Sequence, residues 1–100
     1  MSLPPRRAKR IDTNQTEIVL GLRRVGVAVW VLGSPADLLC GFRGRFVTLE
    51  VKDGKLAPSR RKLTMMEEVY QSVCEDLHLP HFVVGSLAEA LKALEVVRGP

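Results

Sequence analysis

Cysteine and long hydrophobic runs are both scarce in this chain of 100 residues, and each shortage excludes a class of protein. The two cysteines, Cys40 and Cys74, are too few for a disulfide framework and lack the spacing of zinc ligands, so we interpret both as small buried side chains. No stretch approaches the roughly 18 apolar residues that span a bilayer, and the first residues lack the apolar segment of a signal peptide. We therefore expect an intracellular, cytoplasmic protein with no membrane partner.

Charge and length indicate a single small domain with a basic surface. The net charge is +4 and 26% of the residues are charged, which is ordinary for a globular domain. The length suits one modest core, and we divide the chain into a flexible basic arm at residues 1–10 and a single domain at residues 11–97. Basic residues cluster in the arm and again at 60–62, a distribution consistent with a nucleic-acid partner and also with simple solubility. The candidates for nucleic-acid binding are Arg10, Lys55, Arg60, Arg61 and Lys62.

The hydrophobic pattern predicts an α/β fold. Apolar residues recur at helical spacing from about residue 12 to 25, from about 59 or 64 to 77, and from 86 onwards, and runs of strand formers occur at 27–32, 38–40, 46–51 and 82–84. The order is α-β-β-β-α-β-α, and we expect a mixed four-stranded sheet flanked by helices on both sides. Trp30 in the first strand is interpreted as a core residue, with stacking on a nucleic-acid base as the alternative.

A predicted hairpin brings two acids together. Two apolar runs flank a turn that contains Gly44. With the turn centred on this glycine and the residue before it, Asp37 lies opposite Glu50, and such facing residues have Cβ atoms about 4.5–5.5 Å apart. Like charges in this position repel each other, so we expect a cation between them. Lys52 shares the sheet face of Glu50, and hard carboxylate ligands suit Mg²⁺ or Mn²⁺.

These residues resemble the signature of a known nuclease superfamily. Asp37, a spacer of twelve residues and then Glu50, Val51 and Lys52 are similar to the motif of PD-(D/E)XK nucleases. From about residue 10 to 94 the chain resembles small phage-type proteins, namely the stand-alone VRR-NUC and Holliday-junction-resolvase-like nucleases. The similar positions are Asp12, Asn14, Glu17, the turn at 33–37, the strand end at 50–54, Leu63, Thr64 and residues 83–87. One departure is Ala36, which stands where the family usually has Pro directly before Asp.

The resemblance implies a restriction-endonuclease-like core and a divalent-metal-dependent nuclease that hydrolyses DNA phosphodiester bonds. By the same resemblance, the Mg²⁺ or Mn²⁺ ligands would be Asp37, Glu50, the Val51 carbonyl and, from the first helix, Glu17. Lys52 would orient or deprotonate the attacking water, or contact the scissile phosphate. Glu67 stands where the family commonly has Gln, and it is a possible accessory residue together with Asn14.

The resemblance also bears on assembly and substrate. Resolvase-like relatives commonly use two copies of the site, so we expect a homodimer. Selective cleavage of junction or branched DNA in phage replication, repair or recombination would fit such a pair of sites.

Two other classes of function stay open. A non-catalytic nucleic-acid-binding protein could keep the nuclease fold, but it would be expected to lose the acid pair, and both acids are present. A small structural phage protein without a nucleic-acid partner would leave the basic cluster at 60–62 and the basic arm unexplained.

Overall fold

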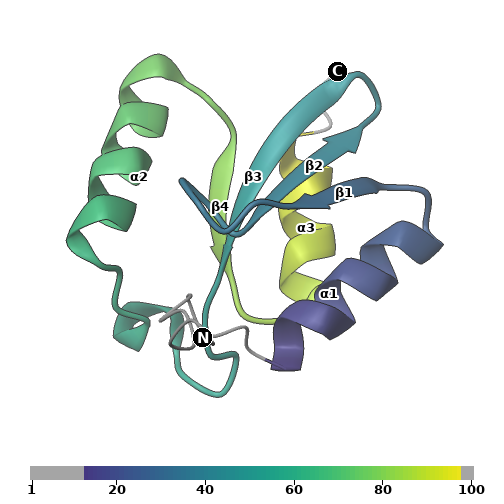
Figure 1. Ribbon diagram of the computed structural model, residues 1–100, viewed down its shortest axis with the longest axis horizontal. Coiled ribbons are helices and arrows are strands. Elements are labelled where there is room, and N and C mark those ends of the chain that lie inside the picture. Colours follow the sequence, from purple (N-terminus) through teal and green to yellow (C-terminus); the bar gives the residue numbers. More distant parts are fainter. Residues whose placement is uncertain (1–12, 98–100) are drawn as a thin grey trace, which may run out of the picture.

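The computed structural model describes residues 13–97 and has one four-stranded sheet and three α-helices (Figure 1). In chain order the elements are α1 (Thr13–Arg24), β1 (Ala28–Val31), β2 (Leu38–Phe42), β3 (Arg45–Val51), the 3-10 turn η1 (Pro58–Arg60), α2 (Met65–Leu77), β4 (His81–Val84) and α3 (Leu87–Val97). The predicted α/β class and the mixed four-stranded sheet are confirmed. The predicted arm at 1–10, with Arg10, and the position of Asp12 lie outside the described residues. Among the described helices, none is both long and apolar enough to cross a membrane.

The sheet is mixed because its connections differ in length. Its strand order is β1-β2-β3-β4, and the pairs β1–β2 and β2–β3 are antiparallel. The pair β3–β4 is parallel, since the chain passes through α2 before it returns to the sheet. The strands β1 and β4 form the two edges, and β3 lies in the interior beside the hairpin partner and the parallel strand.

The hairpin between β2 and β3 has the register expected from the sequence. Leu38 faces Leu49, and the turn residues are Arg43 and Gly44. Their φ angles are 51° and 80°. A two-residue turn with both residues in the left-handed region matches the right-handed twist of the flanking strands. Continuing this register by one pair sets position 37 opposite position 50.

One face of the sheet packs against α1 and α3, which lie side by side in Figure 1. Alternate residues of β3 point to this face because strand side chains alternate. The large apolar side chains that are fully buried are Ile18, Leu22, Leu38 and Leu49. Cys40 and Cys74 are both free and buried, which confirms their interpretation. Burial raises the pKa of the Cys40 thiol to about 11.

The opposite face of the sheet is covered only in part, by α2 on the β4 side (Figure 1). Tyr70 of α2 reaches Thr48 of β3, with the two hydroxyl oxygens 3.1 Å apart, and its ring packs edge-on against His81 of β4. Trp30 on β1 is 49% exposed. The core interpretation of Trp30 is therefore wrong, because α2 leaves this part of the sheet open.

Candidate functional site

Asp37 is fixed at the start of the hairpin by hydrogen bonds on both its main chain and its side chain. The Leu32 amide N–H donates to the Asp37 carbonyl oxygen at 2.8 Å, which closes the bend between β1 and β2. The Val51 amide N–H donates to Asp37 Oδ2 at 2.7 Å. Ala36, the departure from the family pattern, is fully buried, and the hairpin keeps its register beyond it. The carboxylate is therefore placed against the end of β3, as predicted.

Glu50 brings the second carboxylate to the same place. Only 1% of the residue is exposed, and 4% of Asp37. An extension of the hairpin register by one pair beyond Leu38 and Leu49 corresponds to Cβ atoms about 4.5–5.5 Å apart. Two buried carboxylates this close repel each other unless positive charge or hydrogen-bond donors compensate them.

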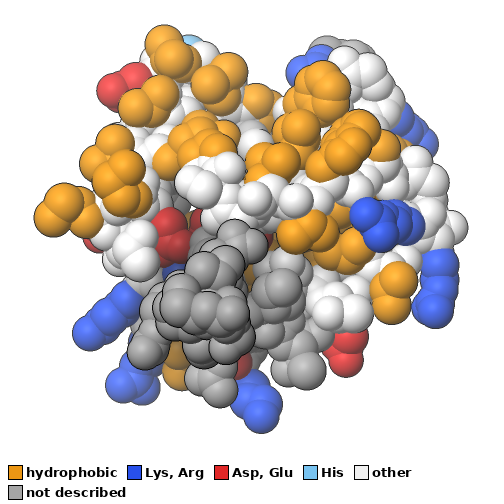
Figure 2. Space-filling view, viewed as in Figure 1, with side chains coloured by type: hydrophobic (Ala, Val, Ile, Leu, Met, Phe, Trp, Pro, Cys, Tyr) orange, Lys and Arg blue, Asp and Glu red, His pale blue; other side chains and the backbone are white. Residues whose placement is uncertain are grey.

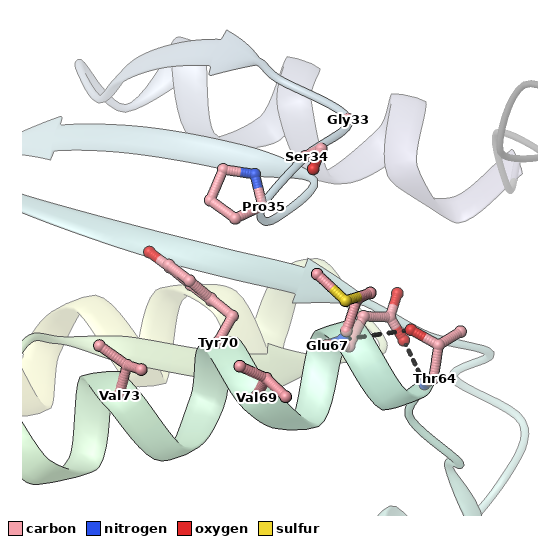
Figure 3. Close-up of a pocket in the computed structure, with 9 residues that line it drawn as sticks. Gly33, Ser34, Pro35, Thr64, Glu67, Val69, Tyr70 and Val73 are labelled. Carbon is pink, nitrogen blue, oxygen red and sulfur yellow. Dashed lines mark hydrogen bonds between the residues drawn. The ribbon is translucent and has the colours of Figure 1, made fainter.

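Lys52 supplies a positive charge at this position. Its Nζ lies 3.9 Å from Glu50 Oε2 and 2.7 Å from Glu67 Oε1. Glu67 comes from the first turn of α2, where its Oε1 also accepts the Thr64 amide N–H at 2.8 Å and its own amide donates to Thr64 Oγ1 (Figure 3). This is a capping box, and it holds the Glu67 side chain beside the lysine. The accessory position expected for Glu67 is thus at the site.

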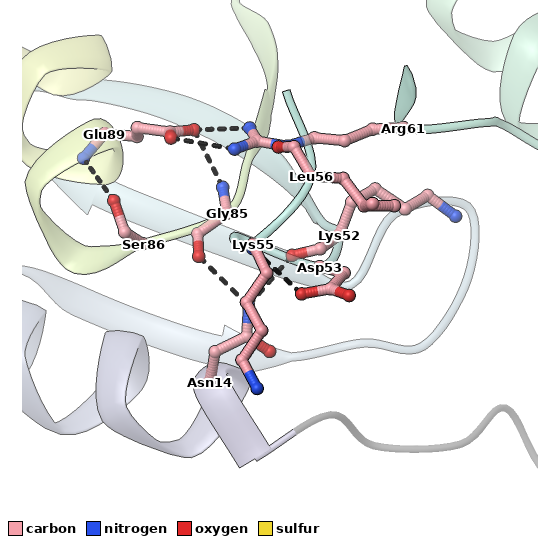
Figure 4. Close-up of polar contacts among 9 residues, drawn as sticks. All are labelled: Asn14, Lys52, Asp53, Lys55, Leu56, Arg61, Gly85, Ser86 and Glu89. Carbon is pink, nitrogen blue, oxygen red and sulfur yellow. Dashed lines mark hydrogen bonds and ion pairs between the residues drawn. The ribbon is translucent and has the colours of Figure 1, made fainter. Parts of the chain in front are cut away.

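Glu17 does not join these carboxylates. It is exposed on α1, and within residues 13–97 no three His, Cys, Asp or Glu side chains come together closely enough to hold a metal ion. The expectation that Glu17 completes the ligand set is therefore wrong. The first turn of α1 meets the sheet through Asn14 instead, whose Nδ2 donates to the carbonyl oxygens of Lys52 and Gly85 at 2.8 and 3.1 Å (Figure 4). Asn14 thus joins the ends of β3 and β4 and supports the Lys52 backbone.

Arg61 is a structural residue rather than a phosphate contact. Its side chain is 3% exposed. Its Nη1 and Nη2 donate to Glu89 Oε1 and Oε2 at 2.6 and 3.0 Å, and its Nε donates to the Leu56 carbonyl at 2.9 Å (Figure 4). The hydrogen bonds from Arg61 lower the pKa of Glu89, against the opposing effect of burial. This pairing overturns the expectation that Arg61 binds DNA, because the guanidinium is already engaged.

The loops after β3 and β4 meet beneath this ion pair. A Cβ atom on Gly54 would lie 2.1 Å from the Gly85 carbonyl oxygen, and one on Gly85 would lie 2.6 Å from the Gly54 Cα. The Gly85 amide N–H also donates to Glu89 Oε1 at 2.9 Å. The other expected phosphate contacts, Lys55, Arg60 and Lys62, are exposed.

A hollow of about 440 Å³ opens beside Glu67, between α2 and the bend at 33–35 (Figure 3). Val69, Tyr70 and Val73 form its α2 wall, and Pro35 lies on the opposite side. The hydrophobic pattern of the sequence does not predict this hollow. The spacing of Thr64 and Glu67 is a sequence signal for two of its lining residues, because Thr-x-x-Glu is the pattern of a capping box at the start of a helix.

The donor set of this site fits a hard divalent cation. Mg²⁺ and Mn²⁺ prefer oxygen ligands, and Mg²⁺ usually takes one or two protein carboxylates while water and substrate phosphate fill the other positions. Asp37 and Glu50 are two such carboxylates, both buried at the end of the β2–β3 pair, where Asp37 Oδ2 accepts the Val51 amide N–H. The Val51 carbonyl belongs to the same strand end, next to Lys52.

Comparison of the chain with models of protein families, with curated proteins and with solved structures finds no match in any of the three. The assignment of a function therefore rests on the geometry of the described residues.

Proposed function

We propose that the protein is a divalent-metal-dependent nuclease of the PD-(D/E)XK type that hydrolyses DNA phosphodiester bonds. The observation that carries the proposal is the buried pair Asp37 and Glu50 with the Lys52 ammonium beside it. Burying two facing carboxylates works against folding. Such an arrangement at the end of a strand, next to an open hollow, is better explained by a cation and a reaction than by stability.

The chain's own residues would have distinct roles in this reaction. Asp37, Glu50 and the Val51 carbonyl would hold Mg²⁺ or Mn²⁺, which when bound neutralises phosphate charge and lowers the pKa of water. Lys52 contacts the scissile phosphate or orients the attacking water. Glu67 positions Lys52, because its carboxylate is fixed by the cap of α2 and lies 2.7 Å from the lysine Nζ.

The exposed basic side chains support DNA as the substrate. Three basic residues after β3 are exposed, in contrast to the buried Arg61; they are Lys55, Arg60 and Lys62. A domain of this size has little surface for a branched duplex, so a second copy of the chain would supply a second site for junction or branched DNA.

The test combines metal binding with cleavage. Asp37→Asn and Glu50→Gln should abolish cleavage of labelled linear, nicked, flap and junction DNA in Mg²⁺ or Mn²⁺, and Lys52→Met should lower the rate by about 10²–10⁴-fold. Glu95→Gln, which removes an exposed acid of α3, is the matched control and should cleave normally. Calorimetry should detect Mn²⁺ binding by the wild type and its loss in Asp37→Asn. If the wild type bound no Mn²⁺ with or without DNA, the nuclease proposal would have to be given up. Metal-independent DNA binding without cleavage would instead favour the non-catalytic alternative.

A further inference from the structure

The hollow beside Glu67 adjoins the candidate active site on both of its walls. The bend at 33–35 leads through Ala36 to Asp37, and Glu67 belongs to the wall that α2 forms. The Glu67 carboxylate is also the group whose Oε1 lies 2.7 Å from Lys52 Nζ. A ligand that is bound at Lys52 therefore has the hollow directly beside it.

The lining of the hollow is mostly apolar and carries no positive charge. Figure 2 shows hydrophobic side chains gathered over α2 and over the strands beside it. The apolar residues that line the hollow are Pro35, Met66, Val69 and Val73. Among the described residues Glu67 is the one charged residue of the lining, and hydroxyl groups come from Ser34 and Tyr70. A phosphate would meet a carboxylate here and no cation, so the hollow suits the uncharged part of a ligand.

Tyr70 is held in place on the α2 wall. Its hydroxyl oxygen lies 3.1 Å from Thr48 Oγ1 on β3. Its ring meets the His81 ring edge-on, with the centroids 4.9 Å apart. Figure 3 shows the Tyr70 side chain extending from α2 toward the sheet, with Pro35 across the hollow from it. Because the ring is already fixed, it has little freedom to lose when a ligand packs against it.

We propose that the hollow binds the base of an unpaired nucleotide next to the cleaved bond, and that this base stacks on Tyr70. The inference rests on the proposed function, because a phosphodiester group held at Lys52 carries a nucleoside on each side. The volume of about 440 Å³ falls within the roughly 300–1,000 Å³ of small-ligand sites. An aromatic residue among apolar side chains, with a few polar groups, is the usual lining of a pocket that receives a base.

This assignment narrows the substrate to DNA with an unpaired nucleotide at the cleaved bond. A base inside a duplex is paired and stacked, and it must leave the helix before it enters a pocket. The cost of leaving is least for a base that is already single-stranded. Flaps and branch points supply such a base, so the proposed nuclease should cleave them faster than blunt linear duplex.

The experiment compares a DNA strand that has bases with one that has none. Anisotropy in EDTA, where no cleavage occurs, measures the affinity for a labelled short oligothymidylate and for an entirely abasic strand of equal length. Both strands carry the same charge, so contacts to phosphates contribute equally to the two affinities. The wild type should bind the oligothymidylate roughly 5- to 100-fold more tightly, the effect expected for one stacked base.

Two variants of Tyr70 separate stacking from a structural role. Tyr70→Leu and Tyr70→Phe both lose the contact with Thr48, but only Tyr70→Phe keeps a ring. Tyr70→Leu should therefore lose the preference for the oligothymidylate and bind the abasic strand as the wild type does, whereas Tyr70→Phe should retain most of the preference. Ser72→Ala is the matched control, because Ser72 is an exposed residue of α2 outside the hollow, and it should bind both strands as the wild type does.

The base subsite and the nuclease can fail separately. A preference for bases that Tyr70→Leu removes, in a protein that cleaves no DNA, would support the subsite and overturn the proposed function. Equal affinity of the wild type for the two strands, or equal preference in Tyr70→Phe and Tyr70→Leu, would overturn the subsite whatever the cleavage result. A preference that disappears as the protein self-associates at higher concentration would also overturn it, by showing that a second copy fills the hollow.

Discussion

Glu67 has two roles that a change of charge can separate. Its carboxylate closes the α2 cap with Thr64 and contacts the Lys52 ammonium. Glu67→Gln keeps an oxygen for the cap, as Gln serves at this position of a capping box, but it leaves Lys52 to pair with Glu50. We predict weaker Mn²⁺ binding by calorimetry with almost unchanged thermal stability.

Glu67→Ala should weaken Mn²⁺ binding similarly and also cost about 1 kcal/mol of stability, because the cap is lost. Equal stability of the Gln and Ala variants would contradict the capping role. Unaltered Mn²⁺ affinity in both variants would contradict the role of Glu67 in placing Lys52.

His81 makes the stability of the fold depend on pH. Burial lowers the pKa of His81 from its usual 6.5, although the contact with Thr48 acts in the opposite direction. The Thr48 Oγ1 and His81 Nδ1 atoms are 2.8 Å apart. Because the folded-state pKa is lower than the unfolded one, the stability is fully present above about pH 6.5 and falls as the pH drops through the folded value.

Urea denaturation between pH 8 and 5 checks this prediction. The wild type should lose stability below about pH 6.5, and His81→Asn should show a flatter profile in that range. Glu89 contributes to stability in a different pH range. Because its folded-state pKa is lowered from 4.5, the stabilisation by Glu89 is lost only as the pH falls below about 4.5. A wild-type profile that is flat from pH 8 to 5 would contradict the assignment of His81.

At the scale of elements, the Arg61–Glu89 pair joins the segment after β3 to α3. We predict that Arg61→Ala lowers the unfolding free energy by about 2 kcal/mol, because it removes charge-assisted hydrogen bonds and leaves Glu89 without them. Arg60→Ala changes an exposed neighbour and should stay within about 0.5 kcal/mol of the wild type. Chemical denaturation of both variants gives the comparison.

The same two variants distinguish structural from DNA-binding arginines. Arg60→Ala should reduce the salt dependence of duplex binding by about 0.9 in the logarithmic slope if it loses one phosphate contact. Arg61→Ala should leave that slope unchanged. A reduced slope in Arg61→Ala with a normal slope in Arg60→Ala would reverse the assignment.

The hairpin was predictable in detail because its information is local. The side-chain period of two and the turn at Gly44 determine which residues face each other, so Asp37 and Glu50 could be paired from the sequence. Arg61 was not predictable in this way. Its partner Glu89 is 28 positions away, and three consecutive basic residues look alike until the fold buries one of them.

The sequence predicted which residues of a helix share one side, but periodicity does not say whether another element covers that side. The spacing of Met66, Val69, Val73 and Leu77 indicates one apolar side of α2 but not what covers it. These four side chains are 45–74% exposed. Trp30 was misjudged for the same reason, since a continuous apolar run predicts a strand covered on both faces, and here one face is open.

For the whole molecule, the homodimer remains a prediction, and the exposed apolar side of α2 is the surface on which we test it. The outer apolar residues Leu20 and Val96 are 50% and 69% exposed, while Val97 packs partly against the core. The apolar side of α2 includes Met66, Val69 and Val73, which also line the hollow beside Glu67, and exposed patches of this kind mark sites of association. We predict that Val69→Glu converts a dimer into a monomer.

Light scattering at micromolar concentration measures this outcome. The wild type should have twice the 11.1 kDa mass of one chain, and Val69→Glu should have the single mass. Leu20→Glu on α1 is the control and should remain dimeric. A wild-type mass near 11.1 kDa would remove the paired-site arrangement, and the chemistry of a single site would be unaffected.

The contact between Gly54 and Gly85 limits how this sequence can vary. Since even a methyl group at either position would overlap backbone atoms of the other loop, a library that tries every amino acid at positions 54 and 85 should return glycine at both. Backbone atoms cannot be trimmed by a second substitution, so no change at one position rescues a change at the other. Descendants of this sequence can alter the residues around the two loops while the pair of glycines stays fixed.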